Sequence, residues 1–320
     1  MTADAHHIGV LLKEVTSALR PQKNGIYVDG TFGSGSYSKA LLEAADCEIW
    51  AIDRDPLAKS FARQLSDLFP GKIKFLQGCY GDMIGLIEPF GVTKVDGIVL
   101  DLGVSSMQLD DPSRGFSFRY DGPLDMRMSS HGATAADIIN RETEQKLSEI
   151  IFQFGEERAS RKVAREIVSQ RKLKPITTTF QFANIIRKVV RRAKDGLDPA
   201  TRTFQALRIY VNHELEALGK GLAAAEKLLV PGGRLAVVSF HSLEDRKVKT
   251  MMKQKSGQAS RPSRHLPVNL SRTNMPTFNI IRHQPITPSA AELEINSRAR
   301  SARLRVAERT VVSSSDVMRN

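Results

Sequence analysis

The 320-residue sequence is short of cysteine, with only Cys47 and Cys79, and it has no long apolar run. Two cysteines this far apart give neither a disulfide framework nor the spacing of a cysteine metal site. No stretch approaches the roughly 18 apolar residues that cross a bilayer as a helix. The first residues also lack the basic and apolar segments of a secretion signal. We therefore expect a cytoplasmic protein with reduced thiols, no metal site and no membrane segment.

Acidic residues are outnumbered, because 47 Lys and Arg stand against 35 Asp and Glu, a formal net charge of +12. A basic excess of this size favours a polyanionic partner, either a nucleic acid or an anionic membrane surface. Between residues 158 and 194, Glu166 is the single acid among many Lys and Arg. A solvated helix face normally mixes both signs, so this segment is predicted to contact phosphate.

The stretch that organises the chain is residues 26–38, which contains Gly30, Gly33 and Gly35. Its apolar start predicts a short buried strand that ends in Asp29, followed by a tight loop and a helix. Glycine allows a positive φ and has no Cβ, and the helix start presents free N–H groups. The pattern predicts a cofactor site at the carboxyl end of the first strand of an α/β sheet.

The dinucleotide fingerprint G-x-G-x-x-G is missing from this loop, because Ser38 stands where the third glycine belongs. Asp29 would repel a pyrophosphate, whereas it can accept hydrogen bonds from an ammonium group. The pattern D-G-x-x-G-x-G is similar to motif I of class I S-adenosylmethionine (AdoMet) methyltransferases. Taken alone, the loop also fits an ordinary turn between a strand and a helix. A nicotinamide oxidoreductase is disfavoured, since it would need the third glycine and no Asp29.

Two further apolar runs, residues 48–53 and 95–101, predict strands that again end in an acid. The carboxyl ends of parallel strands meet at one edge of a sheet, so Asp29, Asp53 and Asp101 are expected to converge. Three neighbouring carboxylates are costly unless a ligand binds beside them. Asp53 has the position from which an acid accepts hydrogen bonds from ribose hydroxyls; its alternative role is a helix cap.

A large insertion separates the fourth and fifth predicted strands, because the next clear strand, residues 234–240, begins more than 130 residues after Asp101. Helix-start signals at Thr134, Thr143 and residues 177–179 make the insertion mostly α-helical. The expected parts are a discontinuous sheet domain of residues 1–106 and 213–309, an inserted helical domain of residues 107–212, and a frayed tail of residues 310–320.

His241 follows the fifth predicted strand and is expected to lie at the same edge as the three acids. Ser242 and Asp245 match a capping box, so part of this motif marks a helix start. Two closing strands are predicted near residues 277–283 and 301–307, and we expect them to be antiparallel.

Eight segments resemble, in order and spacing, the bacterial 16S rRNA cytosine-N4 methyltransferases, the RsmH or MraW family. They are Asp29–Gly33, Ala51–Pro56, Leu100–Ser106, Arg114–Phe118, Asp121–Arg127, Ala200–Gln205, Ser239–Arg246 and Leu304–Arg309. The resemblance implies a class I AdoMet-dependent methyltransferase, with a Rossmann-like α/β sheet and an inserted all-α recognition domain. Its substrate would be one cytidine, position 1402 in conventional ribosomal numbering, in the 16S rRNA decoding region of the small ribosomal subunit.

The resemblance also carries over a set of cofactor-binding positions. They are Gly33, Gly35, Ser36, Tyr37, Asp53, Tyr80, Asp101 and Gln108. Ser36 and Tyr37 stand where many family members have Gly-His, so backbone contacts with AdoMet are expected there. For Tyr80, the residues themselves leave two interpretations, a ring against the adenine or simple packing.

Asp101 and His241 are the candidate catalytic residues. The cytosine N4 amine is a poor nucleophile, because its lone pair is delocalised into the ring, so the site must align amine, methyl and sulfur. It must also accept hydrogen bonds from the N4 protons. Asp101 either orients the amine or holds the cofactor. The base has to leave its stack, and Phe116, Phe118 and Tyr120 are candidate stacking platforms, with local packing as the alternative for each.

The alternative function is a non-catalytic RNA-binding factor for ribosome assembly. Such a factor would keep the basic insertion but tolerate loss of the three acids, and all three are present. The sequence leaves open whether the chain forms a homodimer and which residue accepts the amine proton.

Overall fold

The computed structural model describes residues 9–192, 196–258 and 275–311. The chain divides into two compact units, one of residues 1–103 with 216–320 and one of residues 104–215. We call them the sheet unit and the helical unit and describe each by itself. The predicted frayed tail lies, except for its first two residues, outside the described residues.

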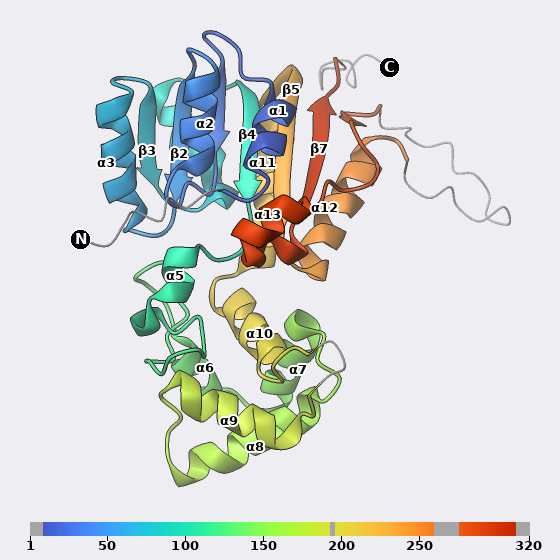
Figure 1. The fold of residues 1–320 in the computed structure, drawn as a ribbon. Helices are drawn as coiled ribbons and strands as arrows, with labels where there is room; N and C mark the ends of the chain where they lie inside the picture. The colour runs from blue at the N-terminus through green and yellow to red at the C-terminus, as the bar shows by residue number, and fades with distance from the viewer. Residues whose placement is uncertain (1–8, 193–195, 259–274, 312–320) are drawn as a thin grey trace, which may run out of the picture. The chain divides into compact units, whose positions relative to one another are not determined.

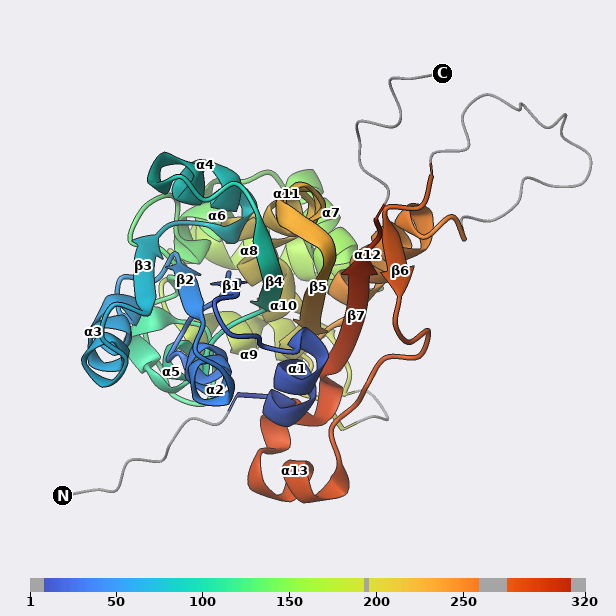
Figure 2. The same cartoon turned by 90° about the horizontal axis from the view of Figure 1, so that it is seen from above.

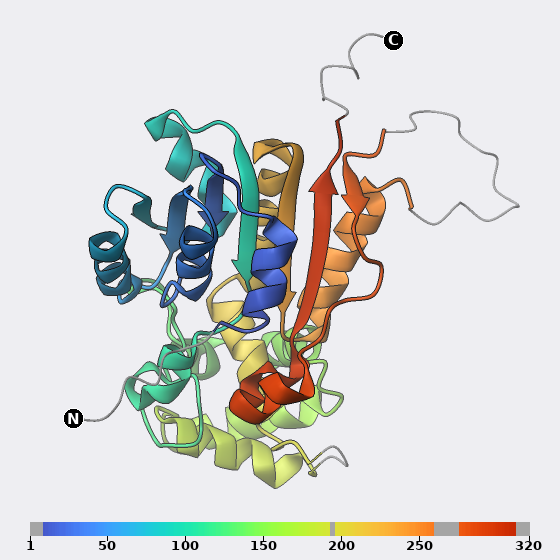
Figure 3. The same ribbon diagram turned by 45° about the horizontal axis from the view of Figure 1, so that its top comes forward.

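One seven-stranded sheet forms the centre of the sheet unit (Figure 1). Its strands are β1 (Ile26–Asp29), β2 (Glu48–Asp53), β3 (Ile73–Gln77), β4 (Val95–Asp101), β5 (Leu229–Ser239), β6 (Phe278–Ile280) and β7 (Arg303–Arg309). The order is β3-β2-β1-β4-β5-β7-β6. The first five strands are parallel, and β7 runs antiparallel between β5 and β6 (Figure 3). This arrangement confirms the predicted α/β sheet with its parallel strands and its antiparallel closing strands.

Helices cover both faces of this sheet (Figure 2). One face carries α1 (Leu12–Leu19), α2 (Ser36–Ala44) and α3 (Ala58–Leu68), and the other carries α4 (Met83–Ile87), α11 (Glu214–Leu228) and α12 (Ser242–Lys255). Side chains alternate along β2: Ile49 and Ala51 join the first core cluster, whereas Trp50 and Ile52 join the second. The parallel strands are buried on both faces of the sheet, so their sequences are continuous apolar runs. For this reason their positions can be predicted from the sequence.

The first helix, α1, has a sharply defined start. It begins at Leu12, because Leu11 adopts a left-handed conformation with φ 54°. The Leu11 N–H donates to Glu292 Oε1 (2.7 Å), which belongs to the short helix α13 (Ala290–Ile295). A contact across 281 positions in the sequence therefore fixes where α1 starts.

The helical unit contains α5 (Ser106–Asp110), α6 (Ala135–Arg141), α7 (Glu144–Gly155), α8 (Ser160–Leu173), α9 (Thr179–Val189) and α10 (Thr201–Val211). Thr134, Thr143 and Thr178 cap α6, α7 and α9 through their hydroxyl groups, which confirms the predicted helix starts. The apolar faces of these helices enclose a core that includes Leu147, Ile167, Phe182 and Leu207. Among the described residues, no helix of either unit combines the length and the apolar character needed to span a bilayer.

Candidate functional site

The loop from β1 to α2 lies at the carboxyl edge of the sheet and depends on its glycines. Gly33 and Gly35 have positive φ, 55° and 82°, a region that side chains disfavour. A Cβ on Gly35 would lie 2.6 Å from the Phe32 ring, and one on Gly30 would lie 2.6 Å from Leu100 Cδ2. The loop backbone is therefore held close to its neighbours without side chains of its own in between.

Asp29, at the end of β1, is fully buried and braces this loop. Its Oδ2 accepts a hydrogen bond from Ser38 Oγ (2.7 Å), and its Oδ1 accepts one from the Thr31 N–H (3.3 Å). Burial raises the pKa of Asp29 to about 6 despite these bonds. The carboxylate thus ties the strand end to the first turn of α2.

Asp53, at the end of β2, is bound to the same loop. The Gly33 N–H donates to its Oδ2 (2.7 Å), and the Asp55 N–H donates to its Oδ1 (2.8 Å). Asp55 in turn accepts from the Leu57 N–H (3.0 Å) ahead of α3, so it fills the capping role. Asp53 remains partly exposed, and a carboxylate has about four lone-pair positions, so it retains the capacity to accept from a ligand.

Asp101, at the end of β4, has a buried carboxylate oxygen without a hydrogen-bond partner among the described residues, and both ring nitrogens of His241 are likewise buried and unpaired. The Asp101 N–H donates to Thr31 Oγ1 (2.6 Å), which fixes the strand end against the loop. The unpaired oxygen of Asp101 is Oδ1. Burial raises the pKa of Asp101 to about 8; the Tyr37 hydroxyl lowers it, and Asp29 and Glu244 raise it further. An unpaired buried acceptor costs about 1–3 kcal/mol, which points to a function.

Two aromatic residues expected at the cofactor are largely enclosed by protein. Tyr37 is buried, and its hydroxyl donates to Val10 O (2.6 Å). Tyr80 belongs to the core, and its ring packs so closely on α11 that a Cβ on Gly221 would lie 2.6 Å from its Cδ2. Both residues pack against the site: Tyr37 lies beside Asp101, and Tyr80 packs against Gly30.

His241 is the N-cap residue of α12, and Glu244 stands at the third position of that helix. Its Nε2 lies 3.0 Å from Glu244 Oε1, and Glu244 Oε2 accepts from the Phe240 N–H (2.9 Å). The predicted capping box of Ser242 and Asp245 is wrong by one residue. The side chain of Asp245 is instead held by Arg305 of β7, with Nε to Oδ1 at 2.6 Å.

Gln108 lies in the helical unit, where it closes a capping box with Ser105 at the start of α5. The Ser105 N–H donates to Gln108 Oε1 (3.1 Å), and the Gln108 N–H donates to Ser105 Oγ (3.2 Å). The side chain is buried. Its assignment as a cofactor contact stays a prediction.

The three candidate stacking residues differ in exposure. Phe116 is buried in the helical core, and Phe118 packs edge-to-face on Phe204 with ring centroids 4.8 Å apart. Tyr120, in contrast, is 65% exposed. Of the three, Phe116 is buried, Phe118 is half-buried and Tyr120 is exposed within the helical unit.

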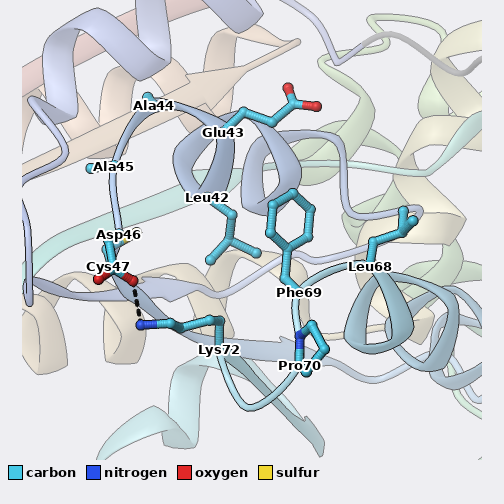
Figure 4. A pocket seen from close by; sticks show the side chains of 10 residues that line it. All are labelled: Leu42, Glu43, Ala44, Ala45, Asp46, Cys47, Leu68, Phe69, Pro70 and Lys72. Atoms are coloured by element: carbon cyan, nitrogen blue, oxygen red, sulfur yellow. Dashed lines mark ion pairs between the residues drawn. The ribbon is translucent and has the colours of Figure 1, made fainter.

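A cavity of about 430 Å³ lies elsewhere in the sheet unit (Figure 4). Its lining includes Leu42, Cys47 and Phe69, together with an ion pair between Lys72 and Asp46. Cys47 and Lys72 directly precede β2 and β3, so the cavity lies at the amino ends of these strands. It is therefore separate from the edge at which Asp29, Asp53 and Asp101 end their strands.

Sequence reasoning missed three residues of this edge. Thr31 accepts from the Asp101 backbone, Ser38 binds Asp29, and Glu244 contributes to the raised pKa of Asp101. Of the three, only Thr31 and Ser38 could have been predicted from the sequence. They are hydroxyl residues close to Asp29, and a hydroxyl group can donate a hydrogen bond to a buried carboxylate.

Known proteins resemble this chain in sequence over nearly its whole length. The sequence model of the MraW methylase family matches residues 4–310. A protein named ribosomal RNA small subunit methyltransferase H, from Rhodospirillum centenum, is 58% identical over 308 residues, 96% of this chain and 93% of its own. Proteins of the same name from Paramagnetospirillum magneticum and Rhodospirillum rubrum are 54% and 52% identical to this chain. The alignments cover 95% and 97% of this chain, respectively, and 96% of each of these two proteins.

Proposed function

The chain belongs to the MraW methylase family, and on that premise we propose that it transfers a methyl group from AdoMet to 16S rRNA in the small ribosomal subunit. The names of its close relatives support the class of substrate. We further propose that the acceptor is N4 of one cytidine in the decoding region and that the enzyme acts in the cytoplasm. The observation that carries this proposal is the buried, unpaired Oδ1 of Asp101 beside the glycine loop.

The residues of the carboxyl edge fit a positively charged nucleoside. Gly33 and Gly35 have positive φ and carry no Cβ, so no side chain of theirs covers the loop, and Ser36 begins α2 directly behind it. Asp53 accepts from ribose hydroxyls, and a hydrogen bond of this charge-assisted kind is worth about 1.5–3 kcal/mol. Nearby carboxylates disfavour a pyrophosphate but favour a cation. AdoMet, when bound at this edge, supplies a methyl group on a positively charged sulfonium.

Asp101 acts on the substrate amine. Its unpaired Oδ1 accepts an N4–H hydrogen bond, which orients the nitrogen and stabilises the positive charge that develops on it. With a pKa near 8, the Asp101 carboxylate is also a stronger base than an ordinary aspartate, so it can take the proton that the methylated nitrogen releases. In this proposal only the deprotonated form of Asp101 is active.

His241 acts as a positioning residue rather than by contact with the base. Its imidazole lies against Glu244, and the negative charge of Glu244 helps to hold the pKa of Asp101 high. Loss of His241 should therefore shift the pH profile of methylation more than it changes the affinity for AdoMet.

The test is methyl transfer to small subunits from a strain that lacks this gene. With purified protein and labelled AdoMet, we expect one labelled nucleotide, identified as N4-methylated cytidine in the decoding region. Subunits that already carry the modification are the control and should accept no label. Label on another atom, another rRNA region or no rRNA at all would contradict the proposal.

A further inference from the structure

Two exposed aromatic rings lie at the start of α9 in the helical unit. Tyr120 is 65% exposed and Phe180 is 40% exposed. They sit on adjoining backbone, because Thr179 Oγ1 donates to Tyr120 O (3.1 Å) and the Phe180 N–H donates to Asp121 Oδ1 (2.9 Å). Single exposed rings are common, but two that come from distant segments and meet at one place suggest a binding surface.

The backbone beneath these rings is firmly held. The Thr179 N–H donates to Gly122 O (2.9 Å), and Pro123 pairs with Thr178 in an isolated β-bridge. The loop is so tightly folded that a Cβ on Gly122 would lie 2.0 Å from Pro112 O. The backbone that carries the rings therefore needs little further ordering when a ligand binds.

The exposed face of α9 continues from Phe180 with polar and basic side chains. Asn184 and Lys188 follow at steps of four, and Arg191 lies just beyond the helix end; all three are exposed. No acid occurs between residues 179 and 192. Lys188 and Arg191 take part in no ion pair within the described part of the chain. We call Tyr120, Phe180, Asn184, Lys188 and Arg191 the α9 strip.

Arg187 differs from the other cations of α9, because it is already engaged. Its Nη2 lies 2.8 Å from Asp198 Oδ2, and its guanidinium lies 5.5 Å from the centre of the Phe118 ring. Arg187 thus supports the helix, while Lys188 and Arg191 remain available to phosphate.

The chemistry of the α9 strip matches one class of ligand. Exposed rings followed by unpaired cations are the combination by which proteins bind single-stranded nucleic acid, with stacked bases and neutralised phosphates. A duplex would hide its base faces from the rings and would use the cations alone. The net charge of +12 favours a polyanion over an ordinary protein partner.

We propose that the α9 strip binds an unpaired rRNA segment that flanks the methylated cytidine. Tyr120 and Phe180 stack on its bases, Asn184 hydrogen-bonds to it, and Lys188 and Arg191 contact its phosphates. This inference rests on the proposed function for the identity of the RNA, but not for the mode of binding.

The test measures binding of an unstructured single-stranded RNA and of a duplex of the same length by fluorescence anisotropy. Tyr120→Ala and Phe180→Ala should each weaken single-strand binding about 5- to 100-fold, whereas Tyr120→Phe and Phe180→Tyr should retain it. Duplex affinity should change little in all four variants. Phe152→Ala is the matched control, since Phe152 is 62% exposed on α7 of the same unit and should be silent.

The cations give a second readout. Lys188→Gln with Arg191→Gln should flatten the slope of log affinity against log salt by about 1.4 for a single strand, because each lost phosphate contact removes about 0.7. AdoMet binding, followed by calorimetry, should be unchanged in every variant.

Wild-type affinity in both alanine variants, or an equal loss in Phe152→Ala, would overturn the inference. The methylation assay is independent of this result. If wild-type protein methylates subunits but the strip variants bind RNA normally, only the α9 strip proposal fails. If the strip variants lose RNA but the wild-type protein methylates no cytosine, only the proposed function fails.

Discussion

The two units of the chain place their charges in opposite ways. In the sheet unit, Asp29 and Asp101 are withdrawn from water, and burial raises their pKa values to about 6 and about 8. In the helical unit, the cations of α9 stand in solvent. Buried charges are expensive and few, so each must have a specific partner or task. Exposed cations of one sign cost little individually and act together on a polyanion. This contrast in burial is the basis on which we propose catalysis for the first unit and RNA binding for the second.

The largest effect should follow from loss of the buried charge. Asp101→Asn keeps the size of the side chain but removes the base and the charge, so we expect methyl transfer to fall at least about 100-fold. Single-turnover transfer to unmodified small subunits measures this loss. AdoMet affinity, measured alongside, should change far less. If Asp101→Asn retained wild-type turnover, the catalytic role proposed for Asp101 in the sheet unit would be wrong.

The next effect concerns cofactor affinity. Asp53→Ala should weaken AdoMet binding about 10- to 150-fold, because it removes a charge-assisted acceptor. Asp53→Asn keeps one acceptor oxygen and should lose less. Calorimetry measures both, and Asp46→Ala is the control, since Asp46 is an exposed acid paired with Lys72 beside the cavity at the amino ends of β2 and β3. Unchanged affinity in both Asp53 variants would argue against the ribose contact.

Charge reversal in the helical unit should have a smaller and salt-dependent effect. Arg191→Glu with Arg192→Glu should weaken binding to small subunits and reduce the salt slope by roughly 1 per lost phosphate contact. Lys39→Glu reverses an exposed lysine of α2 and serves as the control. The control reverses one charge and the double variant reverses two. If the control loses half as much binding free energy as the double variant, net charge alone explains binding and the comparison between the units breaks down.

The smallest effect is on stability. A folded-state pKa near 8 for Asp101, above the ordinary 3.8, means that the native protein binds this proton more tightly than the unfolded chain. Wild-type stability should therefore fall as the pH rises from about 4 to about 8, and Asp101→Asn should lack that part of the fall. Thermal unfolding should show the variant a few degrees more stable at pH 8, with the difference shrinking toward pH 5. A constant difference across this range would contradict the raised pKa.

Local patterns predicted much of this molecule from the sequence. Asp29, Asp53 and Asp101 were placed at strand ends because buried parallel strands read as apolar runs and stop at a polar residue. Thr134, Thr143 and the segment 177–179 mark helix starts in the sequence, because capping depends on residues only three apart; the structure shows that Thr178 is the cap of the third helix.

Contacts between segments that are distant in the sequence could not be predicted from local patterns. The sequence around His241 fits two capping boxes, Ser242 with Asp245 or His241 with Glu244. Arg305 lies 60 positions away and binds the side chain of Asp245, which favours the box of His241 with Glu244. Tyr37 is likewise fixed by Val10, 27 positions earlier. The choice among Phe116, Phe118 and Tyr120 depended on which rings the helical core buries, and that is a tertiary property.

The pKa of Asp101 is the most direct measure of the central claim that a buried, unpaired carboxylate stands at the methyl-transfer edge. In protein labelled with ¹³C-aspartate, the Asp101 carboxyl signal can be assigned by its loss in Asp101→Asn and followed from pH 3 to pH 10. The account predicts a titration midpoint near 8 in the absence of cofactor. A midpoint near 4, that of an ordinary exposed aspartate, would contradict it.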